Sequence, residues 1–194
     1  MSAWEWVGVI TSVICVVLCV RRSIWNWPIG IVSVIAFGVF FWQLKLYADV
    51  GLQVFFLVTG FWGWWLWLHG GADHGELPVR RLSARARGFW VLVMVPAIWL
   101  VATLLRRYTD ASLPYWDTLN TALQVAAQLL LMAKYMENWP LWIAADVLSI
   151  GIYLAKGANP TAGLYVLLLV LACLGMAGWL KEVRGSCDAR PGAG

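Results

Sequence analysis

Charged residues are scarce in this chain. Only 12% of its 194 residues are Asp, Glu, Lys or Arg, whereas 62% are hydrophobic. A soluble domain carries about twice that share of charge, so the composition excludes a water-soluble globule and predicts an integral membrane protein. The formal net charge of +4 does not indicate nucleic-acid binding, because the basic residues lie in loops between apolar segments and form no continuous stripe.

Groups that carry out catalysis or hold metals are also missing. The apolar segments contain no histidine, and the sequence has no Ser/His/Asp set, no paired carboxylates and no Gly-rich phosphate loop. Four cysteines without paired spacing provide neither a disulfide framework nor a zinc site. A retinal protein is excluded as well, because all four lysines stand at segment ends. We therefore expect no enzyme activity, no metal and no cofactor.

Long apolar segments, separated by Pro, Gly and charge clusters, predict seven membrane-spanning helices. They are expected at residues 4–22, 28–44, 49–68, 88–106, 116–135, 140–156 and 161–181. A constant offset of 112 positions relates the first three to the last three. Asn26-Trp27-Pro28 recurs as Asn138-Trp139-Pro140, and Trp67 recurs as Trp179. The sequence thus predicts an all-α integral membrane fold of 3+1+3 helices, a parallel repeat whose odd linker helix gives both halves one orientation.

The repeat also divides the chain. We expect a first three-helix bundle at 1–69, a cytoplasmic loop and linker helix at 70–111, a second bundle at 112–184, and a disordered tail at 185–194. Ten Lys and Arg residues fall on one predicted side of the membrane and four on the other. This bias predicts an N-terminus outside and a C-terminus in the cytoplasm. The longest loop, about residues 69–87, is then cytoplasmic, and its basic half is expected to contact lipid headgroups.

The sixth segment has a polar face in an apolar run. Trp142, Asp146, Ser149 and Tyr153 follow one another at steps of four, three and four, which places them on one side of a helix. Asp146 is the one acidic residue well inside any apolar segment. A carboxylate at membrane depth costs several kcal/mol unless it faces protein, water or a partner, so Asp146 is a candidate functional residue. The alternative is a hydrogen bond to a neighbouring helix.

The fifth segment carries an amide stripe. Asn120, Gln124 and Gln128 are each four residues apart, and amides both donate and accept hydrogen bonds, as a carboxamide, a ribose or a pyrimidine requires. These side chains predict a binding site beside the Asp146 face. The alternative is that they join neighbouring helices. Gln43 and Gln53, near the turn between the second and third segments, are weaker candidates.

The fifteen tryptophans divide into two groups. Trp25, Trp27 and Trp139 stand at segment ends, where an aromatic belt at the membrane interface is expected. Trp42 and Trp142 lie nearer the interior of their segments. Their rings are predicted to stack on a flat heterocycle, and on a cationic ring especially well.

Three runs resemble one known family. ENWPLWIAADVLSIGIYLAKG (Glu137 to Gly157), LQVFF (Leu52 to Phe56) and GWWLW (Gly63 to Trp67) are similar to the PnuC family of bacterial vitamin transporters. The resemblance covers about residues 4–184. It implies a fold similar to SWEET sugar transporters, a homotrimer in the bacterial inner membrane, and uptake of nicotinamide riboside by facilitated diffusion. A cytoplasmic kinase would then trap the substrate for NAD biosynthesis.

The resemblance extends the candidate substrate site to Ser33 and Trp64. Nicotinamide riboside has a cationic pyridinium ring, a carboxamide and a ribose. Asp146 is expected to offset the charge, Trp142 to stack on the ring, and the amide stripe to bond the carboxamide or the sugar. Thiamine is also a flat cation and riboflavin has related carriers, so both remain alternatives. A non-transporting membrane scaffold, in which the amides only join helices, is the alternative from another class.

Overall fold

The computed structural model describes residues 3–45, 47–71, 75–108, 114–155, 157 and 159–188. Seven helices account for most of them: α1 (Ala3–Val20), α2 (Asn26–Gln43), α3 (Tyr47–His69), α4 (Ala84–Tyr108), α5 (Pro114–Met132), α6 (Asn138–Ala155) and α7 (Asn159–Asp188). Each begins and ends within a few residues of its predicted segment, except that α7 continues to Asp188. The helix thus includes the first four residues of the predicted tail, and residues 189–194 lie outside the described part. The predicted all-α fold of seven helices is confirmed.

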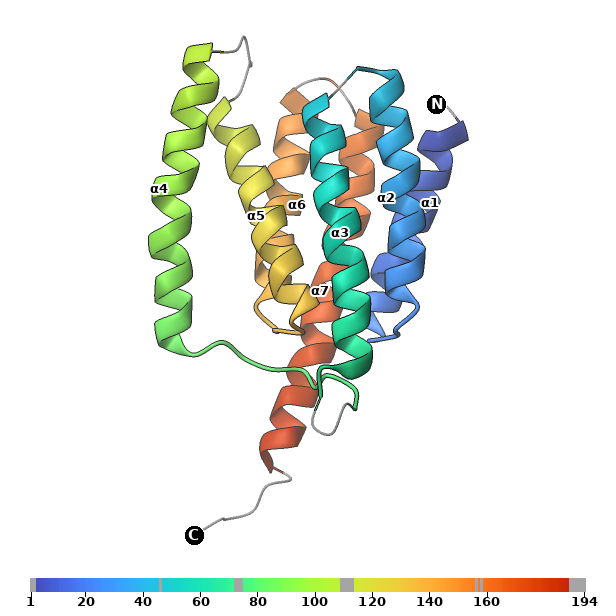
Figure 1. Cartoon of the computed structure of the whole chain (residues 1–194), viewed down its shortest axis with the longest axis vertical. Coiled ribbons are helices and arrows are strands. Elements are labelled where there is room, and N and C mark those ends of the chain that lie inside the picture. The colour runs from blue at the N-terminus through green and yellow to red at the C-terminus, as the bar shows by residue number, and fades with distance from the viewer. Residues whose placement is uncertain are drawn as a thin grey trace.

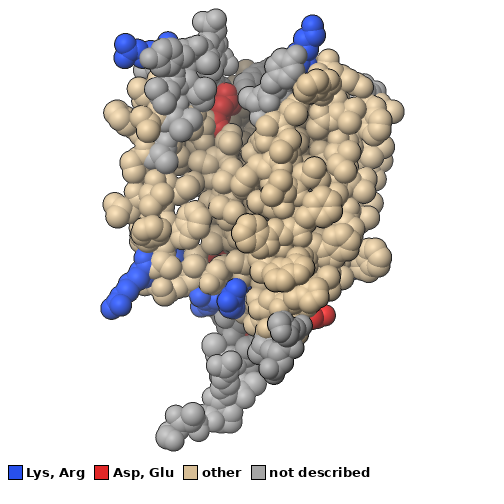
Figure 2. All heavy atoms as spheres, in the orientation of Figure 1, with Lys and Arg blue, Asp and Glu red and all other residues tan. Residues whose placement is uncertain are grey.

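Five of the described helices, namely α1, α2, α3, α6 and α7, are long and apolar enough to cross a membrane. The other two helices are less apolar for reasons visible in the sequence. Arginines stand near both ends of α4, and α5 carries the amide stripe and Asp117. In Figure 2 the Lys and Arg side chains of the visible face gather at its two ends and leave a broad band without them between. This distribution is that of a multi-pass membrane protein.

Six of the helices form a ring. α2 packs between α1 and α3, α6 packs between α5 and α7, and the contacts of α3 with α5 and of α7 with α1 close the ring. The two closing contacts are equivalent under the 112-residue offset, so the halves are related by an approximate two-fold axis. α1 and α5 begin at the same end of the molecule, while α4 stands at the outer edge and packs on α5 (Figure 1).

The turns repeat as closely as the helices. Arg22 follows α1 with φ 58° and Lys134 follows α5 with φ 56°, 112 positions later. This left-handed conformation is a common way for a helix to end. The next helix begins in the same manner in both halves, because the Nδ2 groups of Asn26 and Asn138 donate to the carbonyls of Ser23 and Tyr135 at 2.8 and 2.6 Å. The Asn-Trp-Pro motif therefore specifies a helix start.

The tryptophans of that motif do not belong to an interfacial belt. Trp27 and Trp139 are 4% and 2% exposed and pack in the core with Trp67 and Trp179. The predicted belt position of Trp27 and Trp139 was wrong, because close helix approach at Gly63 and Gly175 makes room for an indole inside the ring. This core therefore requires that the two indoles remain buried and that no side chain replaces the hydrogen of Gly63 or Gly175.

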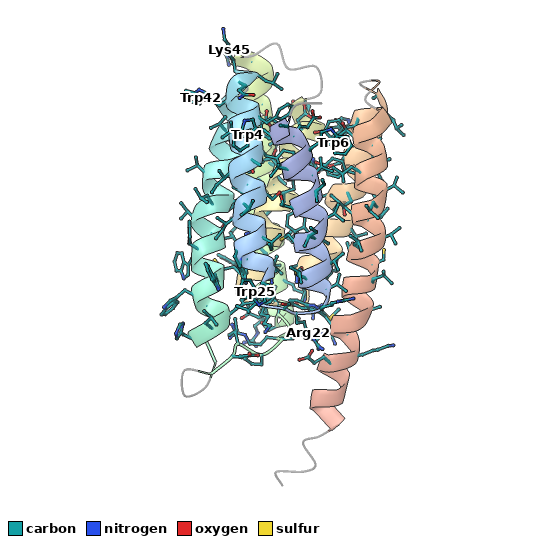
Figure 3. All side chains as sticks on the ribbon, turned by 90° about the vertical axis from the view of Figure 1, so that its right-hand side faces the viewer. Trp4, Trp6, Arg22, Trp25, Trp42 and Lys45 are labelled. Carbon is teal, nitrogen blue, oxygen red and sulfur yellow. The ribbon has the colours of Figure 1, made fainter. Side chains whose placement is uncertain are left out.

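Other tryptophans do mark the two ends of the molecule. Trp25 lies near Arg22 at one end, while Trp42 lies near Lys45 at the other (Figure 3). Both are largely exposed, at 64% and 63%. Trp25 suits the predicted belt. Trp42 was expected nearer the interior, and its exposed position at the end of α2 removes it as a ring-stacking residue.

The loop between α3 and α4 is attached to the turn between α5 and α6. The backbone N–H of Arg80 donates to the carbonyl of Lys134 at 3.0 Å, and the N–H of Met136 donates to the carbonyl of Arg80 at 2.9 Å. The guanidinium of Arg80 also lies over the ring of Tyr135. Burial lowers the pKa of the Lys134 ammonium below its ordinary value. The loop between α3 and α4 is thus packed against this end of the molecule.

Substitution of Gly63 by Ala tests the tryptophan core. A β-carbon there would overlap the indole of Trp27, and one at Gly175 would overlap the indole of Trp139. Overpacking of this kind costs about 1–3 kcal/mol, so both variants are expected to melt at a lower temperature than the parent in detergent solution.

Gly51→Ala and Gly163→Ala provide matched controls on the same two helices. These glycines are also 112 positions apart, and a β-carbon at either would meet nothing within 4 Å. Alanine favours a helix over glycine, so the controls should melt at the same or a higher temperature. Equal melting of all four variants would contradict the tight packing at Gly63 and Gly175.

Candidate functional site

A cavity of about 290 Å³ lies inside the ring of six helices. Its walls come from both halves to nearly the same extent. Of the 25 residues that line it, 20 form ten pairs whose members are 112 positions apart, such as Val34 with Asp146 and Gln53 with Tyr165. The cavity therefore lies on the approximate two-fold axis, and every helix except α4 contributes to it.

Asp146 is a buried carboxylate on the cavity wall. Its side chain is 5% exposed, and neither a hydrogen bond nor an ion pair connects it to any residue that the structure describes. Trp142 lies one turn earlier on α6 and lines the same cavity. Asp146 and Trp142 thus face the same space, and their part in binding a solute stays a prediction. An ionised carboxylate in such a place requires water or a cationic partner.

Two members of the amide stripe face the cavity with Asp146. Gln124 and Gln128 both line it. Gln128 also donates from Nε2 to the hydroxyl of Thr59 on α3, at 3.3 Å. Its amide thus serves two purposes, since the same group joins the halves and forms part of the wall.

Ser33 lines the cavity but its proton is already used. The hydroxyl is 5% exposed and donates to the carbonyl of Gly8 at 2.9 Å, which joins α2 to α1. It can still accept a hydrogen bond from a bound solute.

Four predicted site residues do not line the cavity. Asn120 donates from Nδ2 to the hydroxyl of Ser149 at 3.0 Å, so this pair joins α5 to α6. Tyr153 stacks on Tyr165 with ring centroids 5.3 Å apart. Trp64 packs against the hydrophobic core. Helical spacing places Ser149 and Tyr153 on the face of Asp146, but a face wide enough for all four residues also meets two neighbouring helices.

Several lining residues were missed or ranked low in the sequence. Tyr165 was missed, and Gln53 was a weaker candidate. Asn26, Phe37 and Phe56 also line the cavity. The repeat itself could have identified Tyr165, because it is the partner of Gln53 at the constant offset.

A ring of six helices around an internal cavity that is lined by a carboxylate, amides and aromatic rings is typical of a membrane protein that transports small solutes. Residues 2–181 match the family model described as "Nicotinamide mononucleotide transporter". The chain belongs to this family, the PnuC-type vitamin transporters. It is therefore a transporter of a small vitamin and not an enzyme, and the scaffold alternative is excluded.

Curated relatives are similar over nearly their full length. The chain is 28% identical to the nicotinamide riboside transporter PnuC of Escherichia coli (strain K12), covering 95% of this chain and 87% of that protein. It is 27% identical to the riboflavin/roseoflavin transporter RibM of Streptomyces davaonensis, covering 96% and 88% respectively. A crystal structure of the vitamin B3 transporter PnuC has the same fold, with TM-score 0.74 and 24% identity over 92% of this chain and 80% of that one.

The Asn120–Ser149 pair generates a prediction about stability. Ser149→Ala leaves a partly buried amide without its partner, which costs about 1–3 kcal/mol. The variant is expected to melt at a lower temperature, while its dissociation constant for the vitamin that the parent protein binds changes less than about threefold. Calorimetric titration and thermal unfolding of the same preparation measure both effects. A large loss of affinity at unchanged stability would instead place this pair in the binding site.

Proposed function

We propose that this protein takes up nicotinamide riboside across the bacterial inner membrane by facilitated diffusion, with cytoplasmic phosphorylation trapping the substrate for NAD biosynthesis. The observation that carries the proposal is the Asp146 carboxylate, buried on the cavity wall without a protein partner among the described residues. The relatives named as nicotinamide riboside transporters support the same substrate.

The charge inside the cavity favours a cation. The wall holds the carboxylate of Asp146, and none of the described residues that line it is Lys, Arg or His. A fixed positive charge on the pyridinium ring would pair with Asp146, and the indole of Trp142 offers a face to the same ring. Gln124 and Gln128 supply amide donors and acceptors for the carboxamide and the ribose hydroxyls.

The same charge disfavours two other ligands. Nicotinamide mononucleotide carries a phosphate, whose negative charges would meet a carboxylate and no basic side chain of the wall. Riboflavin, the substrate named for one relative, has no fixed positive charge to pair with Asp146. Thiamine remains the alternative within the family, because its thiazolium ring is also a flat cation.

Orientation and assembly complete the proposal. The end of the molecule that carries Arg22 and Lys134 faces the cytoplasm, as the excess of basic residues on that side predicts. The N-terminus is then outside and the C-terminus inside. We also expect a homotrimer, on the resemblance to the family, and native mass spectrometry of the detergent-solubilised protein measures the subunit number.

Parallel titrations identify the vitamin. Purified protein is titrated with nicotinamide riboside, thiamine, riboflavin and nicotinamide mononucleotide by calorimetry. We expect saturable binding of the riboside and none of the mononucleotide. Binding of thiamine without the riboside would retain the fold and the cation site but change the substrate. Binding of riboflavin alone would contradict the charge argument.

Asp146→Asn tests the role of the carboxylate. Removing one partner of a buried charge pair costs at least about 2 kcal/mol, so affinity for nicotinamide riboside should fall about 30-fold or more. The reduced riboside is almost the same size but uncharged. Its affinity should change little in the same variant. A matched loss for both ligands would show that Asp146 acts by shape or hydrogen bonding.

A control variant separates this effect from a general change of charge. Glu76 lies in the exposed loop between α3 and α4 and does not line the cavity. Glu76→Gln changes the net charge by the same amount as Asp146→Asn and should bind both ligands as the parent does.

A further inference from the structure

Four buried tryptophans form a double layer at one end of the cavity. Trp27 and Trp139 line the cavity, and behind them lie Trp67 and Trp179. Trp67 meets Trp27 edge-on with ring centroids 5.5 Å apart, and Trp179 meets Trp139 edge-on at the same distance. The rings of Trp67 and Trp179 are 6.1 Å apart. Because each residue has its counterpart 112 positions away, the layer straddles the approximate two-fold axis.

Hydrogen bonds connect this layer across the two halves. The indole N–H of Trp67 on α3 donates to the carbonyl of Leu131 on α5, at 3.2 Å. The indole N–H of Trp179 on α7 donates to the carbonyl of Cys19 on α1, at 3.3 Å. Leu131 is the counterpart of Cys19, so the same hydrogen bond occurs at two equivalent positions. In each case the third helix of one half holds the first helix of the other.

Charged groups lie beyond the indoles, away from the cavity. The ammonium of Lys134 lies over the ring of Trp67, with Nζ 4.5 Å from its centroid. Arg22 pairs with Glu182 at the same end of the molecule, where Figure 3 shows Arg22. A solute in the cavity must therefore pass the tryptophan layer before it reaches the charged end, which we call the basic end.

We propose that Trp67 and Trp179 are gate residues, and that their two reciprocal bonds hold the basic end of the cavity shut. Both bonds break in the transport step that opens the cavity to that side. Transporters built from two repeats open by rocking one half on the other, and bonds between the halves must part in that motion. The proposal depends on the transporter family of the chain and is independent of which vitamin it carries.

A native thiol serves as the reporter. Cys15 lines the cavity from α1, one turn before Cys19. In a background with Cys19, Cys173 and Cys187 replaced by Ala, a small charged methanethiosulfonate can react at Cys15 only when it reaches the cavity. Substitution of Cys19 leaves its backbone carbonyl, and hence the hydrogen bond from Trp179, in place. The reagent is added separately to each side of membrane vesicles.

Trp67→Phe and Trp179→Phe remove the N–H donors and keep an aromatic ring. Loss of one neutral hydrogen bond should raise the rate of Cys15 modification from the basic end about fivefold, and loss of both about thirtyfold. The two single variants should be equal, although the residues lie 112 positions apart. If the double variant does not fold, the equality of the single variants still tests the proposal.

Two controls accompany these variants. Trp65 is on the same helix as Trp67 but is 58% exposed, so Trp65→Phe should leave the rate unchanged. A separate Arg81→Cys variant places an exposed thiol in the loop of the basic end and reports which vesicle side that end faces. Thermal unfolding confirms that each variant is folded.

Three results would overturn the proposal: an unchanged rate in a folded double variant, an equal increase from both sides of the membrane, or an equal increase in Trp65→Phe. A failure of nicotinamide riboside to bind would leave this test intact, because the readout is a thiol in the cavity. The gate and the substrate assignment can therefore fail separately.

Discussion

Lipid offers no hydrogen-bond partner, and the arrangement of polar groups in this protein follows from that constraint. Each polar side chain at membrane depth must meet another protein group or face the cavity. Ser33 meets this requirement by donating a hydrogen bond to the carbonyl of Gly8, and Asn120 meets it by donating one to the hydroxyl of Ser149. Asp146 has no such partner among the described residues and faces the cavity instead. The polar groups thus separate into those that assemble the helices and those left for a ligand.

Duplication accounts for the framework but not for the chemistry. The turns after α1 and α5, the Asn-Trp-Pro helix starts and the reciprocal tryptophan bonds occur twice in equivalent positions. The cavity residues are paired as well, yet their character differs between halves. Asp146, Gln128 and Trp142 have Val34, Val16 and Gly30 as counterparts. The second half therefore supplies the carboxylate and two of the three glutamine amides of the wall, while Asn26, Ser33 and Gln53 of the first half add other polar groups.

This division suits a transporter. The two contacts between the halves, α3 with α5 and α7 with α1, have to be similar if both are to open and close together when the halves rock. Recognition has no such requirement, because a single solute such as nicotinamide riboside is itself asymmetric. The tryptophan layer and the Asp146 wall can then change independently, which is consistent with a family whose named members carry different vitamins.

The sequence by itself determined the number and order of the helices, the parallel repeat, and Asp146 as the principal functional candidate. Apolar length, the 112-residue offset and the cost of a carboxylate in lipid are all properties of the chain alone. Helical periodicity also placed Trp142 and Asp146 on one face. It could not say which neighbouring helix each position on that face would meet.

Only the tertiary structure decided that question. Ser149 lies on the predicted face but meets Asn120 of α5, and Tyr153 meets Tyr165 of α7. Trp27 and Trp139, which their positions at segment ends assigned to the membrane interface, became the core of the molecule. The reason is that Gly63 and Gly175 let the third helix of each half approach closely enough to enclose an indole. Such an approach depends on the side chains of two helices together, so the residue pattern of either helix alone cannot predict it.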